Sequence, residues 1–153
     1  MRSLETKIPP PILALLTGCL MWGIASATPS FALSEIIHSA VATFLALGGI
    51  ACVLSGFLAF GRAHTTINPV KPEAASALVC GGIYRYTRNP MYLGLLLVLT
   101  SWAIFLSSAW ALLGPVAFKF YIERFQILPE ERVLAAKFGA AFAEYQSRVR
   151  RWL

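Results

Sequence analysis

Aspartate is absent from this chain of 153 residues, and all seven of its acids are glutamate. Charged residues make up only 13% of the sequence, against about 25% in an average soluble domain. Hydrophobic residues make up 58%. A chain with so few charges and so many apolar side chains is typical of a protein that lies in a lipid bilayer.

Cysteine and histidine are also scarce, which removes the common metal sites and nucleophilic sites. The three cysteines, Cys19, Cys52 and Cys80, form no CxxC pair, so we predict neither a disulfide bond nor a zinc site. The two histidines, His38 and His64, lie far in sequence from the polar clusters of the chain. We therefore expect no bound metal and no Ser/His/Asp or Cys/His catalytic group.

The net charge of +6 has two possible explanations, nucleic-acid binding and membrane orientation. The basic residues lie mostly beside apolar runs, as in membrane proteins whose loops follow the positive-inside rule. We therefore expect contacts with membrane lipids and no nucleic-acid partner.

Four apolar stretches predict four transmembrane helices in an all-α integral membrane protein. The first two cover about Pro10–Ala27 and Glu35–Gly61. Residues 89–118 carry no formal charge, but one helix of that length would run about 45 Å, well beyond the hydrocarbon core of about 30 Å. We therefore predict a helical hairpin of Pro90–Leu106 and Ala109–Ile127.

Small residues within these spans have structural consequences. Gly48, Gly49 and Gly56 would let a neighbouring helix pack closely against the second span. Gly114 and Pro115 would kink the second arm of the hairpin.

The distribution of lysine and arginine predicts which side of the membrane each loop faces. Arg2 and Lys7 flank the first span, and the 62–88 loop carries four basic residues, whereas the 28–35 connection carries none. Both termini and the central loop are therefore expected in the cytoplasm. The short chain suggests a bacterial protein, for which the location would be the inner membrane.

The first apolar run also has features of a secretory signal. Basic residues precede it, and the small residues at 30–32 could serve as a cleavage site. However, the uncharged run from Ile8 to Ser34 is longer than a usual signal core, and further apolar segments follow. We therefore predict a retained transmembrane helix.

The chain after Pro129 has the pattern of an amphipathic helical segment on the cytoplasmic side. Its apolar residues recur at spacings of three and four, the period of one helix face. Gly139 is expected to divide the segment into two short helices. The basic and aromatic end at 148–152 suits the lipid interface. The apolar residues of the face are Leu134, Phe138, Phe142, Tyr145, Val149 and Trp152.

A dense polar segment at 81–92 lies directly before the hairpin, and it has two interpretations. Its glycine pair permits close approach to a ligand, and the first helical turn at Pro90 presents free N–H groups suited to an anion. Its arginine, asparagine and tyrosine side chains add donors and aromatic faces. Arginine and tyrosine also collect at membrane interfaces for solvation alone, so the residues leave both interpretations open.

Two adjacent acids, Glu130 and Glu131, follow the hairpin. In the first turn of a helix they are favoured by the helix dipole and need no function. A carboxylate there could instead hold an ammonium group or ribose hydroxyls. Adjacent helical residues point about 100° apart, so we expect the two acids to have different partners, with one of them pairing with Arg88 or Arg124.

Together, the two polar motifs resemble those of the isoprenylcysteine carboxyl methyltransferase family. The family pattern is Gly-x-Tyr-x-x-x-Arg-His-Pro-x-Tyr-x-Gly, then a helical hairpin, then Glu-Glu-x-x-Leu-x-x-x-Phe-Gly-x-x-Tyr-x-x-Tyr-x-x-x-Val-x-Arg. The likeness covers about residues 79–153. Asn89 replaces a frequent histidine and cannot titrate, and Phe142 replaces a frequent tyrosine. The matching residues are Gly82, Tyr84, Arg88, Pro90, Tyr92, Gly94, Glu130, Glu131, Leu134, Phe138, Gly139, Tyr145, Val149 and Arg151.

The resemblance implies one membrane methyltransferase domain over residues 1–153, with two N-terminal spans at 10–61 and a cofactor-binding core at 79–153. It implies that S-adenosylmethionine binds at the cytoplasmic face and that a lipophilic substrate enters from the bilayer. By this analogy the cofactor is surrounded by Gly82, Tyr84, Arg88, Asn89, Pro90, Tyr92, Glu130 and Glu131. The candidates for catalysis or substrate holding are Arg88, Asn89, Arg124 and Tyr145.

Two other functions are compatible with such a chain, a membrane reductase that uses NADPH and a non-catalytic membrane adaptor. The adjacent acids favour a cofactor that bears an ammonium group over one with several phosphates, because carboxylates repel phosphate. No G-x-G-x-x-G motif follows a strand pattern. The change to asparagine at position 89 is the one hint toward an adaptor, so we predict a methyltransferase whose accepting atom and substrate stay open.

Overall fold

The computed structural model describes residues 7–30, 34–63 and 77–153, and all regular structure in these ranges is helical. The prediction of an all-α fold is therefore confirmed. Most of the possible cleavage site at 30–32 lies outside the described residues, as does His64. The elements in chain order are α1 (Pro10–Ser26), α2 (Glu35–Arg62), η3 (Gly82–Arg85), α3 (Pro90–Phe105), η4 (Trp110–Leu112), α4 (Leu113–Ile122), η5 (Glu123–Ile127), α5 (Leu128–Phe138) and α6 (Ala140–Arg148).

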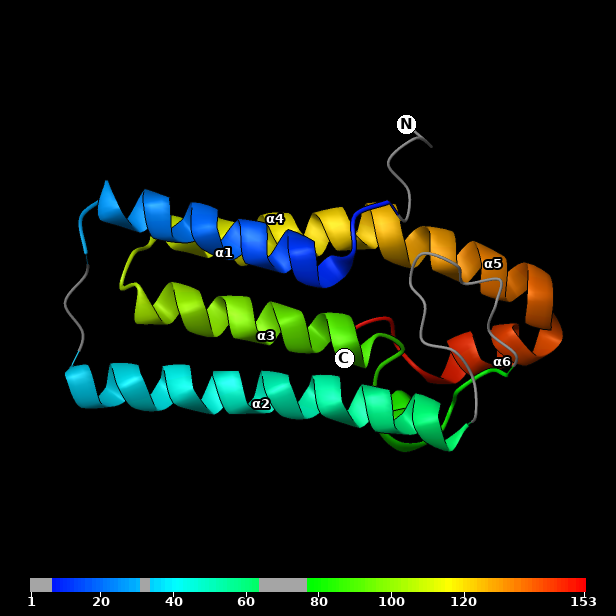
Figure 1. Ribbon diagram of the computed structural model, residues 1–153. Helices are drawn as coiled ribbons and strands as arrows, with labels where there is room; N and C mark the ends of the chain where they lie inside the picture. The colour runs from blue at the N-terminus through cyan, green and yellow to red at the C-terminus, as the bar shows by residue number, and fades with distance from the viewer. Residues whose placement is uncertain (1–6, 31–33, 64–76) are drawn as a thin grey trace.

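Four helices, α1 to α4, lie alongside one another, with α3 in the middle (Figure 1). The α3 helix contacts α2 on one side and both α1 and α4 on the other. Helices α1 and α4 also contact each other, and the fully buried Met21 of α1 packs there against Gly114 of α4. The α5 helix continues from α4 at one end of the molecule, where α6 turns back below it.

Helices α2 and α3 pack closely because glycines take the place of side chains at their contact. A Cβ atom at Gly49 would lie 2.7 Å from the carbonyl oxygen of Gly94, and one at Gly56 would lie 2.7 Å from Cγ of Met91. The predicted close packing is confirmed for these two residues. A Cβ atom at Gly48 would meet nothing within 4 Å, so this glycine has no part in the contact.

The predicted hairpin is also confirmed, since α3 ends at Phe105 and a turn separates it from η4 and α4. Ser107 has a φ of 50° in that turn, and the neighbouring Ser108 hydroxyl is hydrogen-bonded to the Thr28 hydroxyl over 2.9 Å. Because α4 begins at Leu113, Gly114 and Pro115 lie in its first turn, where no N–H from proline is needed. They start this helix instead of kinking one.

The second arm of the hairpin does not end at Ile127 as predicted. Residues 123–127 form a π-helical turn, and α5 follows directly with Pro129 in its first turn. The ring of a proline collides with the carbonyl four residues earlier in a regular α-helix, and a wider turn relieves that collision. Gly139, with a φ of 50°, then ends α5 and separates it from α6, as predicted.

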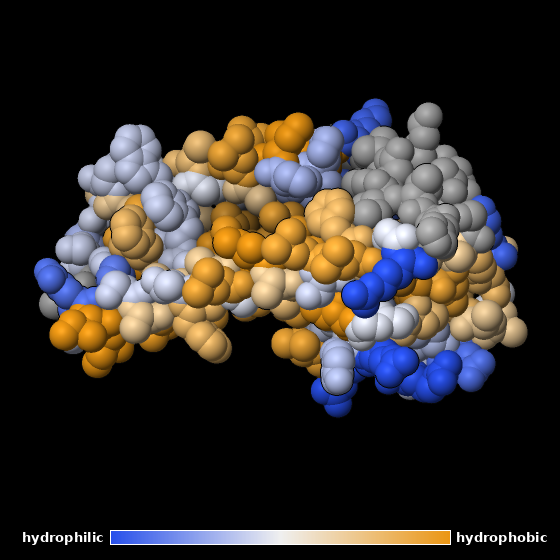
Figure 2. All heavy atoms as spheres, turned by 60° about the horizontal axis from the view of Figure 1, so that its bottom comes forward, coloured by the Kyte–Doolittle hydropathy of each residue, from blue (hydrophilic) through white to orange (hydrophobic). Residues whose placement is uncertain are grey.

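Among the described helices, α2 alone is both long and apolar enough to cross a membrane, while α1 and α3 are shorter apolar helices. Large apolar side chains of α1 and α2 are exposed, among them Leu20, Trp22, Phe44 and Leu58. Figure 2 shows hydrophobic residues across the middle of the α2 face and hydrophilic residues gathered toward the end that carries α5 and α6. A soluble monomer rarely exposes such a continuous apolar surface.

Candidate functional site

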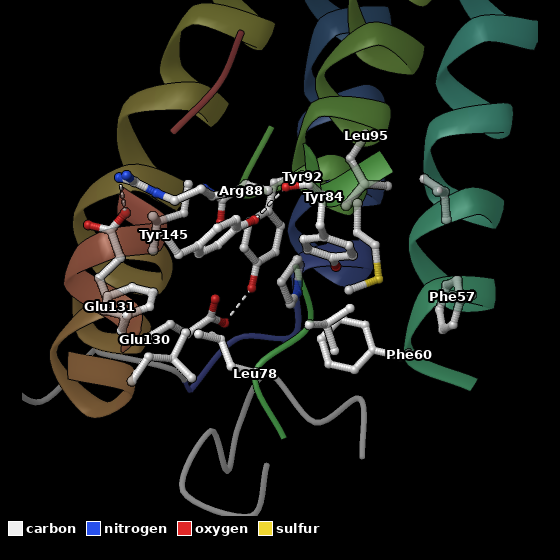
Figure 3. Close-up of a pocket in the computed structure, with 18 of the residues that line it drawn as sticks. Phe57, Phe60, Leu78, Tyr84, Arg88, Tyr92, Leu95, Glu130, Glu131 and Tyr145 are labelled. Atoms are coloured by element: carbon white, nitrogen blue, oxygen red, sulfur yellow. Dashed lines mark hydrogen bonds and ion pairs between the residues drawn. The ribbon is translucent and has the colours of Figure 1, made fainter. Parts of the chain in front are cut away.

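A cavity of about 400 Å³ lies where α2, α3, α5 and α6 meet (Figure 3). One wall is apolar and comes from α2, the start of α3 and the residues before α1, and the other carries the two acids of α5. The cavity is lined by Pro9, Pro10, Pro11, Val53, Phe57, Phe60, Ala77, Leu78, Val79, Tyr84, Arg88, Asn89, Met91, Tyr92, Leu95, Ile127, Glu130, Glu131, Leu134, Phe142 and Tyr145.

The first acid of the cavity, Glu130, is bound to a tyrosine of α3. The Tyr92 hydroxyl donates a hydrogen bond to Oε1 of Glu130 over 2.5 Å (Figure 3). Burial raises the pKa of the Glu130 carboxyl to about 7; the hydrogen bond from Tyr92 lowers it, and the negative charge of Glu131 raises it. Within the residues that the structure describes, no ion pair involves Glu130. This carboxylate therefore has no basic partner of its own.

The second acid, Glu131, is held by two arginines. Arg88 donates to its Oε1 over 2.8 Å, and Arg151 donates to both of its oxygens, over 3.1 Å and 2.7 Å. The predicted pairing of one acid with Arg88 is therefore confirmed. The two adjacent acids also differ in partners, as expected from their angular separation on the helix.

Arg88 also fixes the chain segment that follows α6. Its Nη1 donates to the backbone carbonyls of Gln146 over 3.2 Å and Val149 over 3.0 Å. Its backbone N–H donates to the carbonyl of Arg150 over 3.0 Å. The neighbouring Asn89 donates from Nδ2 to the carbonyl of Arg151 over 2.9 Å. The polar segment before α3 and the C-terminal segment thus lie side by side.

Aromatic rings form the rest of the cavity wall. The Tyr145 hydroxyl donates to the carbonyl of Tyr84 over 2.7 Å, which ties α6 to η3. The Tyr84 ring meets Phe60 of α2 edge to face, with centroids 5.6 Å apart. Burial raises the pKa of Tyr84 and of Tyr145 well above the ordinary value, so both stay neutral. Neutral rings beside an acid without a basic partner are suited to a cation.

Seven of the ten candidate site residues line the cavity: Tyr84, Arg88, Asn89, Tyr92, Glu130, Glu131 and Tyr145. The other three lie elsewhere. Gly82 begins η3 with a φ of 60°, and Pro90 is buried in the first turn of α3. Arg124 is exposed, with its guanidinium 6.0 Å from the centroid of the Phe125 ring.

The position of the chain end at the lipid interface stays a prediction, and two of its side chains pack against η5. Arg148 and Arg150 are exposed, but Arg151 and Trp152 are partly buried. Arg151 and the Trp152 indole N–H both donate to the carboxylate of Glu123 in η5, over 2.7 Å and 3.3 Å. The Glu123 side chain is 28% exposed, so these two donors pair with a partly exposed carboxylate.

The apolar wall from α2 was not predicted from the sequence. Phe57 and Phe60 line the cavity, together with Met91 and Leu95 of α3. The helical spacing of Val53, Phe57 and Phe60 places them on one face. Gly56 brings this part of α2 against the start of α3, and that glycine was the available signal.

Comparison with known proteins identifies the family of the chain. A family model described as phospholipid methyltransferase matches residues 37–141, well over half of the chain. A protein from Haemophilus influenzae, itself described only as uncharacterized, is 46% identical over 63 residues, which are 41% of this chain and all of that protein. No solved structure matches. The family match confirms the resemblance predicted from the two polar motifs.

Proposed function

The chain belongs to the phospholipid methyltransferase family, and we propose that it transfers a methyl group from S-adenosylmethionine to a lipophilic acceptor. The observation that supports this proposal most directly is the cavity, in which an acid without a basic partner lies among aromatic rings and opposite an apolar wall. Its volume of about 400 Å³ falls within the range of about 300–1,000 Å³ that is usual for small-molecule sites.

The side chains of the cavity fit the cofactor by their chemistry. S-adenosylmethionine supplies an electrophilic methyl group on a positively charged sulfur. The Glu130 carboxylate can hold its ammonium group, and the faces of Tyr84 and Tyr92 suit the sulfonium. Asn89 and Tyr145 complete the wall, and no side chain needs to form a covalent bond with the substrate. What the protein contributes is orientation of the two reactants and exclusion of water.

An apolar groove beside the cavity supports a lipophilic acceptor. The groove has a volume of about 890 Å³ and lies between α1 and α2, with α3 as its floor. Leu95 lines both the groove and the cavity, so the two are adjacent. An acceptor with an apolar body could therefore lie among the helices while its polar end reaches the acids.

The arrangement of charges supports a location in the membrane with the cavity toward the cytoplasm. We place α1, α2, α3 and the arm formed by α4 as four membrane spans. The basic residues of α5, α6 and the segment before α3 would then lie on the cytoplasmic side. In a bacterial cell this membrane would be the inner one.

The test is calorimetric titration of the detergent-purified protein with S-adenosylhomocysteine, with NADPH run in parallel. We expect saturable binding of S-adenosylhomocysteine, weakened about tenfold to a hundredfold in Glu130→Ala because a charged hydrogen-bond acceptor is lost. Glu144→Ala is the matched control, since the Glu144 side chain is 69% exposed and lies outside the cavity. Binding of NADPH alone would indicate a reductase, and binding of neither ligand would indicate an adaptor.

A further inference from the structure

The C-terminal segment, Val149–Leu153, packs against the polar segment that precedes α3 and contributes to the candidate site. Its backbone carbonyls accept hydrogen bonds from three consecutive residues of the polar segment, Thr87, Arg88 and Asn89. Val149 is extended, with a φ of −123° and a ψ of 129°, which directs the chain from the end of α6 back toward the start of α3. Residues 61 to 64 positions apart in sequence thereby share one polar cluster.

Arg151 joins two acids that come from different parts of the same helical stretch. Its Nε and Nη2 bind Glu131 of α5, and its Nη1 binds Glu123 of η5 over 2.7 Å. The side chain is 30% exposed and does not line the cavity. The described contacts join the Arg151 guanidinium to the cavity lining through Glu131, and its backbone carbonyl accepts a hydrogen bond from Asn89.

Because of this contact, the negative charge of Glu131 is offset more fully than that of Glu130. Glu131 has two arginines as partners, so its negative charge is offset. Glu130 has a neutral tyrosine hydroxyl as its partner, so its negative charge, when ionised, is not offset by an arginine and is available to a cationic ligand. Without Arg151, the charge of Glu131 would be offset by Arg88 alone and would act more strongly on Glu130.

We propose that Arg151 is a positioning residue of the candidate site, which neutralises Glu131 and so reserves Glu130 for a cationic group of the bound ligand. The proposal rests on the proposed function for the identity of that ligand, but its electrostatic part does not. The Asn89 amide, which holds the backbone carbonyl of Arg151, keeps the guanidinium in place. Asn89 needs only an N–H donor for this task, which explains why a residue that cannot titrate is sufficient there.

Few titratable or charged groups lie near Glu130, so the effect of Arg151 on its ionisation can be measured directly. Tyr92 faces it from α3, Tyr84 acts on it from η3, and Glu131 is its neighbour on α5. Arg88 lines the same cavity from the segment between them. Tyr84 stays neutral near pH 7, so a change in the titration of Glu130 reports on the charge at Glu131.

The experiment is an NMR titration of ligand-free protein labelled with ¹³C at the glutamate carboxyl groups. The chain has seven glutamates, and Glu130→Gln identifies the signal. We expect a midpoint near pH 7 in the unmodified protein and about one pH unit higher in Arg151→Gln, because an opposing charge is removed. Arg151→Lys should shift it less, because lysine keeps the positive charge. Glu131→Gln alone should lower the midpoint, because the negative charge beside Glu130 is removed.

An unchanged midpoint in Arg151→Gln, or one that does not fall in Glu131→Gln, would overturn the proposal. If Arg151→Gln does not fold, the smaller upward shift expected of Arg151→Lys decides the matter. Titration with S-adenosylhomocysteine between pH 5.5 and 8.5 is the second readout, and the pH dependence of its affinity should move with the NMR midpoint. The expected NMR shift without any binding would leave the charge arrangement standing and refute the methyltransferase proposal alone.

Discussion

At the scale of single residues, the Tyr92–Glu130 contact has the clearest chemical consequence. A carboxyl whose pKa lies at about 7 is about half ionised at neutral pH. Because its folded-state pKa is raised above the ordinary 4.5, its charge appears only as the pH rises through about 7. A cationic ligand needs the ionised form, so ligand affinity should rise over the same range of pH.

Tyr92→Phe should move this dependence further upward. The substitution removes the hydroxyl that stabilises the ionised form of Glu130, so the pKa of Glu130 rises and less carboxylate is present at pH 7. We expect several-fold weaker binding of S-adenosylmethionine at pH 7 and partial recovery at pH 8.5, measured by calorimetry. Tyr86→Phe is the control, since Tyr86 is 74% exposed and lies outside the cavity. Equal losses at both pH values would contradict this account.

The site could be predicted in part because its polar residues are local in sequence. The angle between adjacent helical positions predicted separate partners for Glu130 and Glu131, and one of them does pair with Arg88. The role of Arg151 could not be predicted in this way. The chain returns after α6 because backbone carbonyls there accept hydrogen bonds from Asn89 and its neighbours. Every residue has a backbone carbonyl, so the sequence does not indicate which ones form such bonds.

At the scale of the elements, helix packing depends on which face each glycine occupies. Gly48 and Gly49 are adjacent in α2, but a side chain would collide with α3 only at Gly49. We expect Gly49→Ala to destabilise the protein by about 1–3 kcal/mol, because the tightly packed helices must separate. Gly48→Ala should be neutral or slightly stabilising, since alanine favours helix. Thermal unfolding in detergent, followed by circular dichroism, compares the two, and equal unfolding temperatures would argue against the close contact.

The elements also show where pattern-based prediction succeeds and where it fails. The length of the uncharged run at 89–118 predicted a hairpin, since the bilayer limits the length of a span. Gly139 predicted a helix end, because its positive φ is one that other residues rarely adopt. Pro129 does not end a helix, because the wider π-helical turn before it accommodates the proline ring and its missing N–H.

At the scale of the whole molecule, the proposed topology can be tested by labelling from outside the cell. In a cysteine-free background, Ser30→Cys lies at the end of α1 and Ala136→Cys lies on α5, and both positions are exposed. We expect a membrane-impermeant maleimide to label Ser30→Cys in intact bacterial cells and Ala136→Cys only after permeabilisation. The opposite pattern would place the cavity on the outer side of the membrane and refute the proposed orientation.

The continuous helical stretch from α4 through η5 to α5 connects an arm that we propose as a membrane span with the two acids of the cavity. Leu113 and Phe138 lie at its two ends, and no break separates them. A membrane span can tilt to adjust to the thickness of the bilayer. Because the helix is continuous, a tilt of α4 would also move α5, which carries Glu130. Tyr92, the hydrogen-bond partner of Glu130, lies on a different helix, α3. In the proposed topology, the separation of the Glu130 carboxylate from the Tyr92 hydroxyl would therefore depend on the thickness of the surrounding lipid.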